Sequence, residues 1–134
     1  MASSSDYPYT ARSGSCSSSG KPNALSGAKF SRSVRSRGDS SLAAALNKGP
    51  VAMAFEIKGN FNYYKNGVLS IHNCGRTPHH AMTVTGYTPE FWEIKNSWGS
   101  TWGDQGYVRF SRAINNMCGI STWNAYPEIA KAEE

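Results

Sequence analysis

Residues 95–107 read KNSWGSTWGDQGY, a stretch that combines two tryptophans, Trp98 and Trp102, with three glycines. Glycine adopts backbone conformations that other residues avoid, so such a segment can turn tightly around large rings. An ordinary surface loop needs neither this aromatic bulk nor this much backbone freedom. The stretch therefore predicts a compact turn in which aromatic rings cover a neighbouring polar side chain, and Asn96 is the nearest one.

The segments around this turn alternate apolar with polar side chains, as half-buried strands do. Residues 79–87 and 91–98 are expected to form one hairpin, closed by a short turn at 88–90. Residues 106–112 follow as a further strand, and residues 51–57 form an earlier one. The pattern therefore predicts a mainly antiparallel sheet.

The chain before these strands predicts one short helix. Leu42 to Leu46 form its body. Asp39 or Ser40 is expected to cap its first turn, and Gly49 is expected to close its end. The helix thus separates an irregular beginning of the chain from the sheet.

A chain of 134 residues has the length of one domain. Residues 1–38 are rich in serine and glycine, which predicts irregular chain with at most one short edge strand. Residues 39–134 are expected to carry the sheet and its functional side chains. The organisation expected is a single lobe over residues 1–134, of the α+β class.

The predicted hairpin brings two polar side chains together. His80 lies near the start of one strand and Asn96 near the end of its partner, so the two can meet across the sheet. A histidine held by an amide oxygen keeps one tautomer and presents its other nitrogen to a nucleophile. The alternative is simple packing of the two residues, but the neighbouring tryptophans favour proton transfer because they can shield the contact from water.

Composition excludes several classes of protein. The chain is 39% hydrophobic and 12% aromatic, which argues against wholesale disorder. Its longest apolar run, at 51–55, is too short to cross a bilayer, so no membrane partner is expected. Its first residues lack the basic start and apolar stretch of a secretory signal.

Metal and nucleic-acid sites are not expected either. The three cysteines include no CxxC pair and the three histidines no HxxxH spacing, so we predict no metal and no cofactor. The net charge is +5, and residues 12–48 hold seven basic residues against one acidic one. Because aromatic residues are not interleaved there, we interpret this stretch as a solvated basic surface and expect no nucleic acid partner.

The motifs together resemble the papain-like cysteine proteases, the papain and cathepsin family. KNSWGSTWGDQGY resembles that family's asparagine motif, and HAMTVTGY (80–87) resembles its histidine strand. Other segments resemble the family in the same order: DYPYTARSGSC (6–16), GPVAMAFE (49–56), YKNGV (64–68), NCG (73–75) and CGISTWNAYP (118–127). The resemblance covers nearly the whole chain. It implies the family's C-terminal lobe, an α+β fold with a mainly antiparallel, barrel-like sheet and one or two short helices.

The resemblance implies a role for each residue of the hairpin. His80 matches the general base and Asn96 the residue that orients it. Trp98 matches the ring that shields their contact, and Trp102 a second aromatic on the leaving-group side. His79 departs from the family, which usually carries Asn or Asp there, and is expected to line the substrate site.

A substrate pocket is implied by the same resemblance. Ala54, Ala81 and Trp123 match positions that contact the second substrate side chain. Trp123 is a departure, because its counterpart is often smaller or acidic. We expect its ring to leave the pocket shallow or closed, so that small or medium apolar side chains are preferred; the alternative is that Trp123 is only a core residue.

The family's nucleophile is the missing part. Its cysteine lies in a C-G-[SA]-C-[WY] signature, roughly 130–150 residues before the histidine. Only 79 residues precede His80, and Cys16 lies in SGSCSSS, which is not that signature. The nucleophile is therefore expected outside this chain, on an N-terminal lobe, and the chain is expected to be inactive without it.

The resemblance also assigns the cysteines. Cys74 and Cys118 match a disulfide within the lobe, and Cys16 matches a residue that bridges to the N-terminal lobe. Disulfides imply an oxidising compartment, lysosomal or extracellular. The function expected is the C-terminal half of a cysteine endopeptidase acting on peptides or proteins, and the alternative is a non-catalytic binding or structural module derived from a protease.

Overall fold

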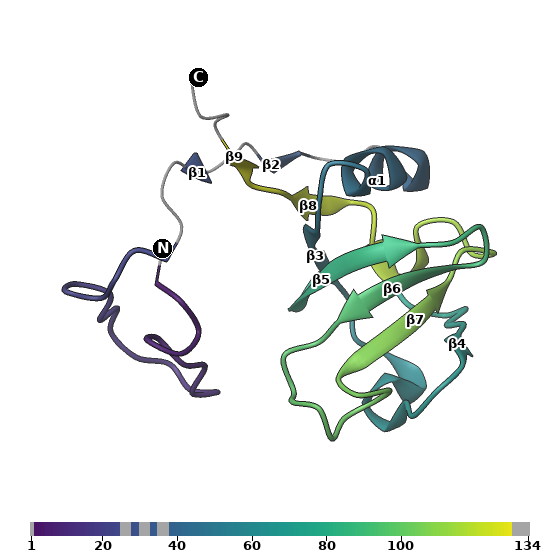
Figure 1. The fold of residues 1–134 in the computed structure, drawn as a ribbon. Helices are drawn as coiled ribbons and strands as arrows, with labels where there is room; N and C mark the ends of the chain where they lie inside the picture. The colour runs from purple at the N-terminus through teal and green to yellow at the C-terminus, as the bar shows by residue number, and fades with distance from the viewer. Residues whose placement is uncertain (1, 25–27, 30–32, 35–37, 130–134) are drawn as a thin grey trace. The chain divides into compact units, whose positions relative to one another are not determined.

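A computed structural model describes residues 2–24, 28–29, 33–34 and 38–129 (Figure 1). The chain divides into two compact units. One unit comprises Met1–Phe30 with Pro127–Glu134, and contains strand β1 (Ala28–Lys29) paired antiparallel with β9 (Glu128–Ile129). The other comprises Ser31–Tyr126 and contains the sheet. The single-lobe organisation stays a prediction.

The second unit is built on one seven-stranded sheet with the order β2-β8-β3-β5-β6-β7-β4 (Figure 1). All neighbours pair antiparallel except β4 and β7. Within the described residues no pairing joins β2 to β4, so the sheet is open and is barrel-like only in a loose sense. The α+β, mainly antiparallel class predicted from the sequence is confirmed. The strands are β2 (Ser33–Val34), β3 (Val51–Phe55), β4 (Val68–Leu69), β5 (His80–Tyr87), β6 (Phe91–Lys95), β7 (Tyr107–Ser111) and β8 (Trp123–Ala125).

Helix α1 runs from Asp39 to Leu46, as predicted, but its start is not capped as predicted. Gly38 is the N-cap residue, and no side chain caps the helix. The Asp39 carboxylate instead accepts the backbone N–H of Asn116 at 3.1 Å, a residue far along the chain. The expected cap by Asp39 or Ser40 is therefore wrong, because a tertiary donor occupies the carboxylate. At the other end, Gly49 donates its N–H to the Leu46 carbonyl, with a φ of 149°.

Two short 3₁₀ helices complete the unit, η1 (Gly59–Tyr63) and η2 (Met117–Gly119). The irregular part before residue 38 contains two strands of two residues each, rather than one. Among the described residues, no helix has the length and apolar content that crossing a membrane requires.

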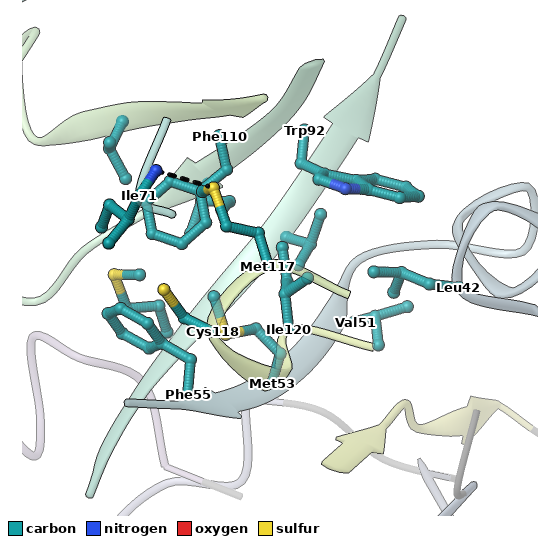
Figure 2. Close-up of a cluster of buried hydrophobic side chains, with 14 of the residues drawn as sticks. Leu42, Val51, Met53, Phe55, Ile71, Trp92, Phe110, Met117, Cys118 and Ile120 are labelled. Carbon is teal, nitrogen blue, oxygen red and sulfur yellow. Dashed lines mark hydrogen bonds between the residues drawn. The ribbon is translucent and has the colours of Figure 1, made fainter. Parts of the chain in front are cut away.

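The core lies on the face of the sheet that carries alternate residues of β3, β5, β6 and β7 (Figure 2). Trp92, Phe55 and Phe110 are completely buried there, and Leu42 of α1 packs against the same cluster. The Ile71 N–H points at the sulfur of Met117, at 3.2 Å. Burying an aliphatic or aromatic side chain of this size contributes roughly 1.5–3 kcal/mol. The core therefore gives β5 and β6 a rigid base.

Cys74 and Cys118 form a disulfide, the pairing that the family resemblance implied. The bond joins residues separated by 44 positions, which contributes roughly 4 kcal/mol in the chain-entropy estimate. Cys118 is buried in the core, so the bond ties the loop before β5 to the centre of the unit. Cys16 is a free, exposed thiol in the other unit.

A β-bulge sets which side chains of β5 reach the core. The register with β6 shifts by one residue between Val84 and Gly86. A one-residue shift moves every later side chain to the opposite face of a strand. On the part of β5 before the shift, Met82 and Val84 are buried, and His80 lies on their side of the strand.

Candidate active site

The centre of the candidate site is a hydrogen bond between His80 and Asn96. Nε2 of His80 lies 2.9 Å from Oδ1 of Asn96. An amide oxygen only accepts, so Nε2 carries the proton and the neutral ring keeps its lone pair on Nδ1. The ring therefore presents Nδ1 as a proton acceptor away from Asn96.

A backbone group fixes the orientation of the Asn96 amide. The N–H of Ser97 donates to the same Oδ1 at 2.8 Å. If the amide were flipped, its NH₂ group would face both this N–H and the His80 ring. Asn96 is 7% exposed, and within the described chain its Nδ2 has no hydrogen-bond partner. The geometry thus keeps the oxygen on His80 and thereby selects the tautomer.

Aromatic rings cover this contact, as the sequence predicted. The Trp98 ring lies 5.1 Å from the His80 ring and is tilted by 35° to it. Trp102 meets Trp98 edge to face at 5.2 Å, and its Nε1–H donates to the Asn62 carbonyl at 3.1 Å. That hydrogen bond fixes the Trp102 indole, and Trp102 in turn packs against Trp98.

Glycines allow the backbone of this turn to close on itself. Gly103 has a φ of 60°, and a Cβ there would lie 2.6 Å from the Tyr107 carbonyl oxygen. Gly106 has a φ of 91°, and its N–H donates to the Trp102 carbonyl at 2.8 Å. Both positions favour glycine, Gly103 also because there is no room for a side chain.

Sequence reasoning missed Phe61, which links the aromatic rings to the core. Phe61 is completely buried, and its ring centre lies 5.4 Å from Trp98, 5.0 Å from Trp102 and 6.3 Å from His80. It lies in the 3₁₀ helix η1, whose sequence GNFNY shows neither strand alternation nor helical periodicity. No local pattern therefore indicated that this phenylalanine lies beneath the site.

The three predicted pocket residues form one row across three strands. Ala54 of β3 lies opposite Ala81 of β5 on one side and opposite Trp123 of β8 on the other. The row borders a cavity of about 250 Å³, lined otherwise by Ala52, Met53, Asn124 and Ala125. Trp123 is 42% exposed, so it is a surface ring at this cavity and not a core residue.

His79 is exposed and lies beside a second cavity, of about 300 Å³. Its backbone N–H donates to the Phe55 carbonyl at 3.1 Å, which holds the backbone of His79 at the end of β3. The structure thus brings together His80, Asn96, Trp98 and Trp102 as one cluster, with Ala54, Ala81, Trp123 and His79 on the sheet beside it.

Cys16 lies in the other unit, the one that contains β1 and β9. Its sulfur lies 3.3 Å from the Ser18 hydroxyl, and this hydrogen bond lowers the pKa of the Cys16 thiol. Among the described residues, no three His, Cys, Asp or Glu side chains are grouped so that they could hold a metal ion.

The sequence of the chain has counterparts among known proteins. The model of the papain family cysteine proteases matches residues 1–128. The chain belongs to the papain family of cysteine proteases. Ananain from Ananas comosus is 34% identical over 96% of the chain, and an aleurain-like thiol protease from Arabidopsis thaliana is 39% identical over 92%.

Solved structures of the family have the same fold. Bromelain from Ananas comosus, solved with the E64 inhibitor, is 34% identical and superimposes on 96% of the chain with a TM-score of 0.74. A Carica candamarcensis cysteine protease, 28% identical, superimposes on 97% with a TM-score of 0.81. The chain spans 39% of ananain, 36% of the aleurain-like protease, 63% of the bromelain structure and 62% of the Carica one. A match of this extent is consistent with the family's C-terminal lobe.

Proposed function

We propose that this chain supplies the proton-transfer half of a cysteine peptidase active site, with His80 as general base and Asn96 as its positioning residue. The observation that carries the proposal is the 2.9 Å contact between His80 Nε2 and Asn96 Oδ1, which leaves Nδ1 as the acceptor. A cysteine thiol needs such a base because the thiolate is the nucleophile.

The reaction proposed is hydrolysis of a peptide bond in two steps. Nδ1 of His80 takes the proton of a cysteine thiol while the sulfur attacks the substrate carbonyl carbon. The same proton passes to the leaving amine as the C–N bond breaks, which leaves a thioester. Water then attacks the thioester and gives a proton to Nδ1, which returns it to the cysteine sulfur as the C–S bond breaks.

The nucleophilic cysteine belongs to an N-terminal lobe outside this chain, and Cys16 bridges to that lobe. Cys16 is suited to this because it is exposed, and its thiolate is favoured by the Ser18 hydroxyl. The chain alone is inactive in this proposal. The Cys74–Cys118 disulfide fits a lysosomal or extracellular location.

An active-site label tests the proposal directly. The chain is produced together with its N-terminal lobe and treated with an epoxide thiol trap, and peptide hydrolysis is measured in parallel. We expect stoichiometric labelling of the lobe's cysteine and hydrolysis that the label abolishes. Absence of both in the assembled protein would contradict the proposal and leave the non-catalytic binding module.

Replacing Asn96 should lower turnover more than it weakens substrate binding. In Asn96→Ala the proton of His80 is free to occupy either ring nitrogen, so part of the population presents the wrong tautomer. We expect kcat to fall about 100-fold, the lower end of a general-base contribution, with KM within about threefold. Asn73→Ala, at an exposed asparagine, serves as the control and should leave both constants unchanged.

Trp123 is proposed to restrict the pocket that it forms with Ala54 and Ala81. Peptides with alanine or valine at the second substrate position should be preferred over those with phenylalanine or arginine. In Trp123→Ala the added space admits a phenylalanine ring, and burying roughly 50 Å² more apolar surface corresponds to about a tenfold gain for that peptide relative to valine. The kcat/KM ratio of the two peptides measures this; an unchanged ratio would remove Trp123 from the pocket.

A further inference from the structure

The imidazole of His79 makes no hydrogen bond or ion pair with another described group. Its backbone is fixed at the start of β5 by the hydrogen bond to Phe55, but its exposed side chain makes no hydrogen bond within the described residues. The ion pair found among the described residues joins Arg109 to Asp104 and does not involve His79. The ring is therefore available to a ligand.

His79 directly precedes β5, which begins at His80. Successive side chains of a strand point to opposite sides, so within β5 His80 lies with the buried Met82 and Ala81 lies on the opposite face. Ala81 faces Ala54 across the two strands. His79 borders the same cavity as these two alanines, so it lies beside the proposed substrate pocket.

The cavity beside His79 has a distinctive lining. It measures about 300 Å³ and is bordered by Ala54, Pro78, His79, His80 and Ala81. Three of these side chains are apolar and two are imidazoles, and none of the five is acidic. It shares Ala54 and Ala81 with the 250 Å³ cavity that Trp123 borders, so the two adjoin.

We propose that His79 selects substrates with an aspartate or glutamate next to the bond that is cut. This rests on the proposed function, because His80 must be the reacting base. His80 itself borders the cavity, so the side chain that enters belongs to a residue flanking the scissile bond. A carboxylate there accepts a hydrogen bond from a ring N–H of His79, and a charge-assisted hydrogen bond is stronger than a neutral one.

The test compares peptides that differ only in charge. Glutamate and glutamine are placed in turn at each of the two positions flanking the scissile bond, and the assembled protein is assayed at one fixed pH. Both kcat/KM and, by fluorescence anisotropy, the Kd of the labelled peptides are measured. We expect glutamate to be favoured about two- to fivefold at one of the positions, a range typical of an exposed charged contact.

Two substitutions at His79 separate charge from shape. His79→Asn removes the imidazole and should bring the glutamate-to-glutamine ratio close to one. His79→Lys places a positively charged donor at the same position and should retain most of the preference. His72→Asn, at another exposed histidine, is the control and should keep the wild-type ratio.

The outcomes distinguish this inference from the proposed function. Hydrolysis without any glutamate preference, or a preference that survives in His79→Asn, overturns the inference and leaves the peptidase proposal intact. If no peptide is cut but the Kd values still depend on charge and on His79, the peptidase proposal fails and recognition of carboxylates by His79 stands.

Discussion

His80→Ala in the assembled protein is expected to lower kcat/KM for peptide hydrolysis by a factor of about 10³ or more. The imidazole acts at two points of the proposed reaction, because it takes the proton of the thiol and then gives it to the leaving amine. Removing a general base that also activates the nucleophile costs at or beyond the upper part of the usual 10²–10⁴ range. Initial rates with a fluorogenic peptide measure the effect.

The fold should survive this substitution, so the loss can be assigned to chemistry. His80 is only half-buried, and its ring contributes an edge contact with Phe55 at 5.6 Å. We expect the far-UV circular dichroism spectrum to be unchanged and the midpoint of thermal unfolding to fall by a few degrees at most. His72→Ala is the matched control. Equal activity of both variants would show that His80 is not the base.

Sequence patterns were sufficient where local chemistry determines the structure. A hairpin over residues 79–98 was predicted because Thr88-Pro89-Glu90 is a turn signal between two alternating segments. The strands observed span 80–87 and 91–95, and Thr88 donates its N–H to the Phe91 carbonyl across that turn. The contact of His80 with Asn96 follows from that hairpin, and the covering by Trp98 follows from its position next to Asn96.

Features that depend on distant contacts were not predicted. The Asp39 carboxylate could have capped its own helix, but it binds the Asn116 N–H, 77 positions away. The bulge in β5 was missed as well, although Gly86 inside an alternating segment is a residue type that often marks a bulge. Phe61 was missed because its partners come from four other parts of the chain.

Replacing Phe61 is expected to affect stability and activity together. Its completely buried ring contacts Phe55 at 5.1 Å, Trp102 at 5.0 Å and Trp98 at 5.4 Å, so it joins the core to the rings over His80. Phe61→Ala leaves a cavity at this junction. Substitutions of this kind cost about 3–5 kcal/mol, which in a chain of this size lowers the melting midpoint by roughly 10–20 °C.

The catalytic effect of Phe61→Ala should appear even below its melting midpoint. Without the ring beneath them, Trp98 and Trp102 lose part of their support, and water gains access to the hydrogen bond between His80 and Asn96. We expect kcat to fall about tenfold at 15 °C with the protein still folded, corresponding to roughly 1.4 kcal/mol.

Tyr63→Ala provides a matched control for Phe61→Ala within the same 3₁₀ helix. Tyr63 is 82% exposed, so its removal should change the unfolding free energy by less than about 0.5 kcal/mol. Phe61→Leu, which keeps most of the apolar volume, should lie between the two in both melting midpoint and kcat. If Phe61→Ala has the same melting midpoint as Tyr63→Ala, Phe61 does not support the site. If Phe61→Ala is destabilised but keeps full kcat, Phe61 is not needed for the tryptophans to protect the His80–Asn96 hydrogen bond.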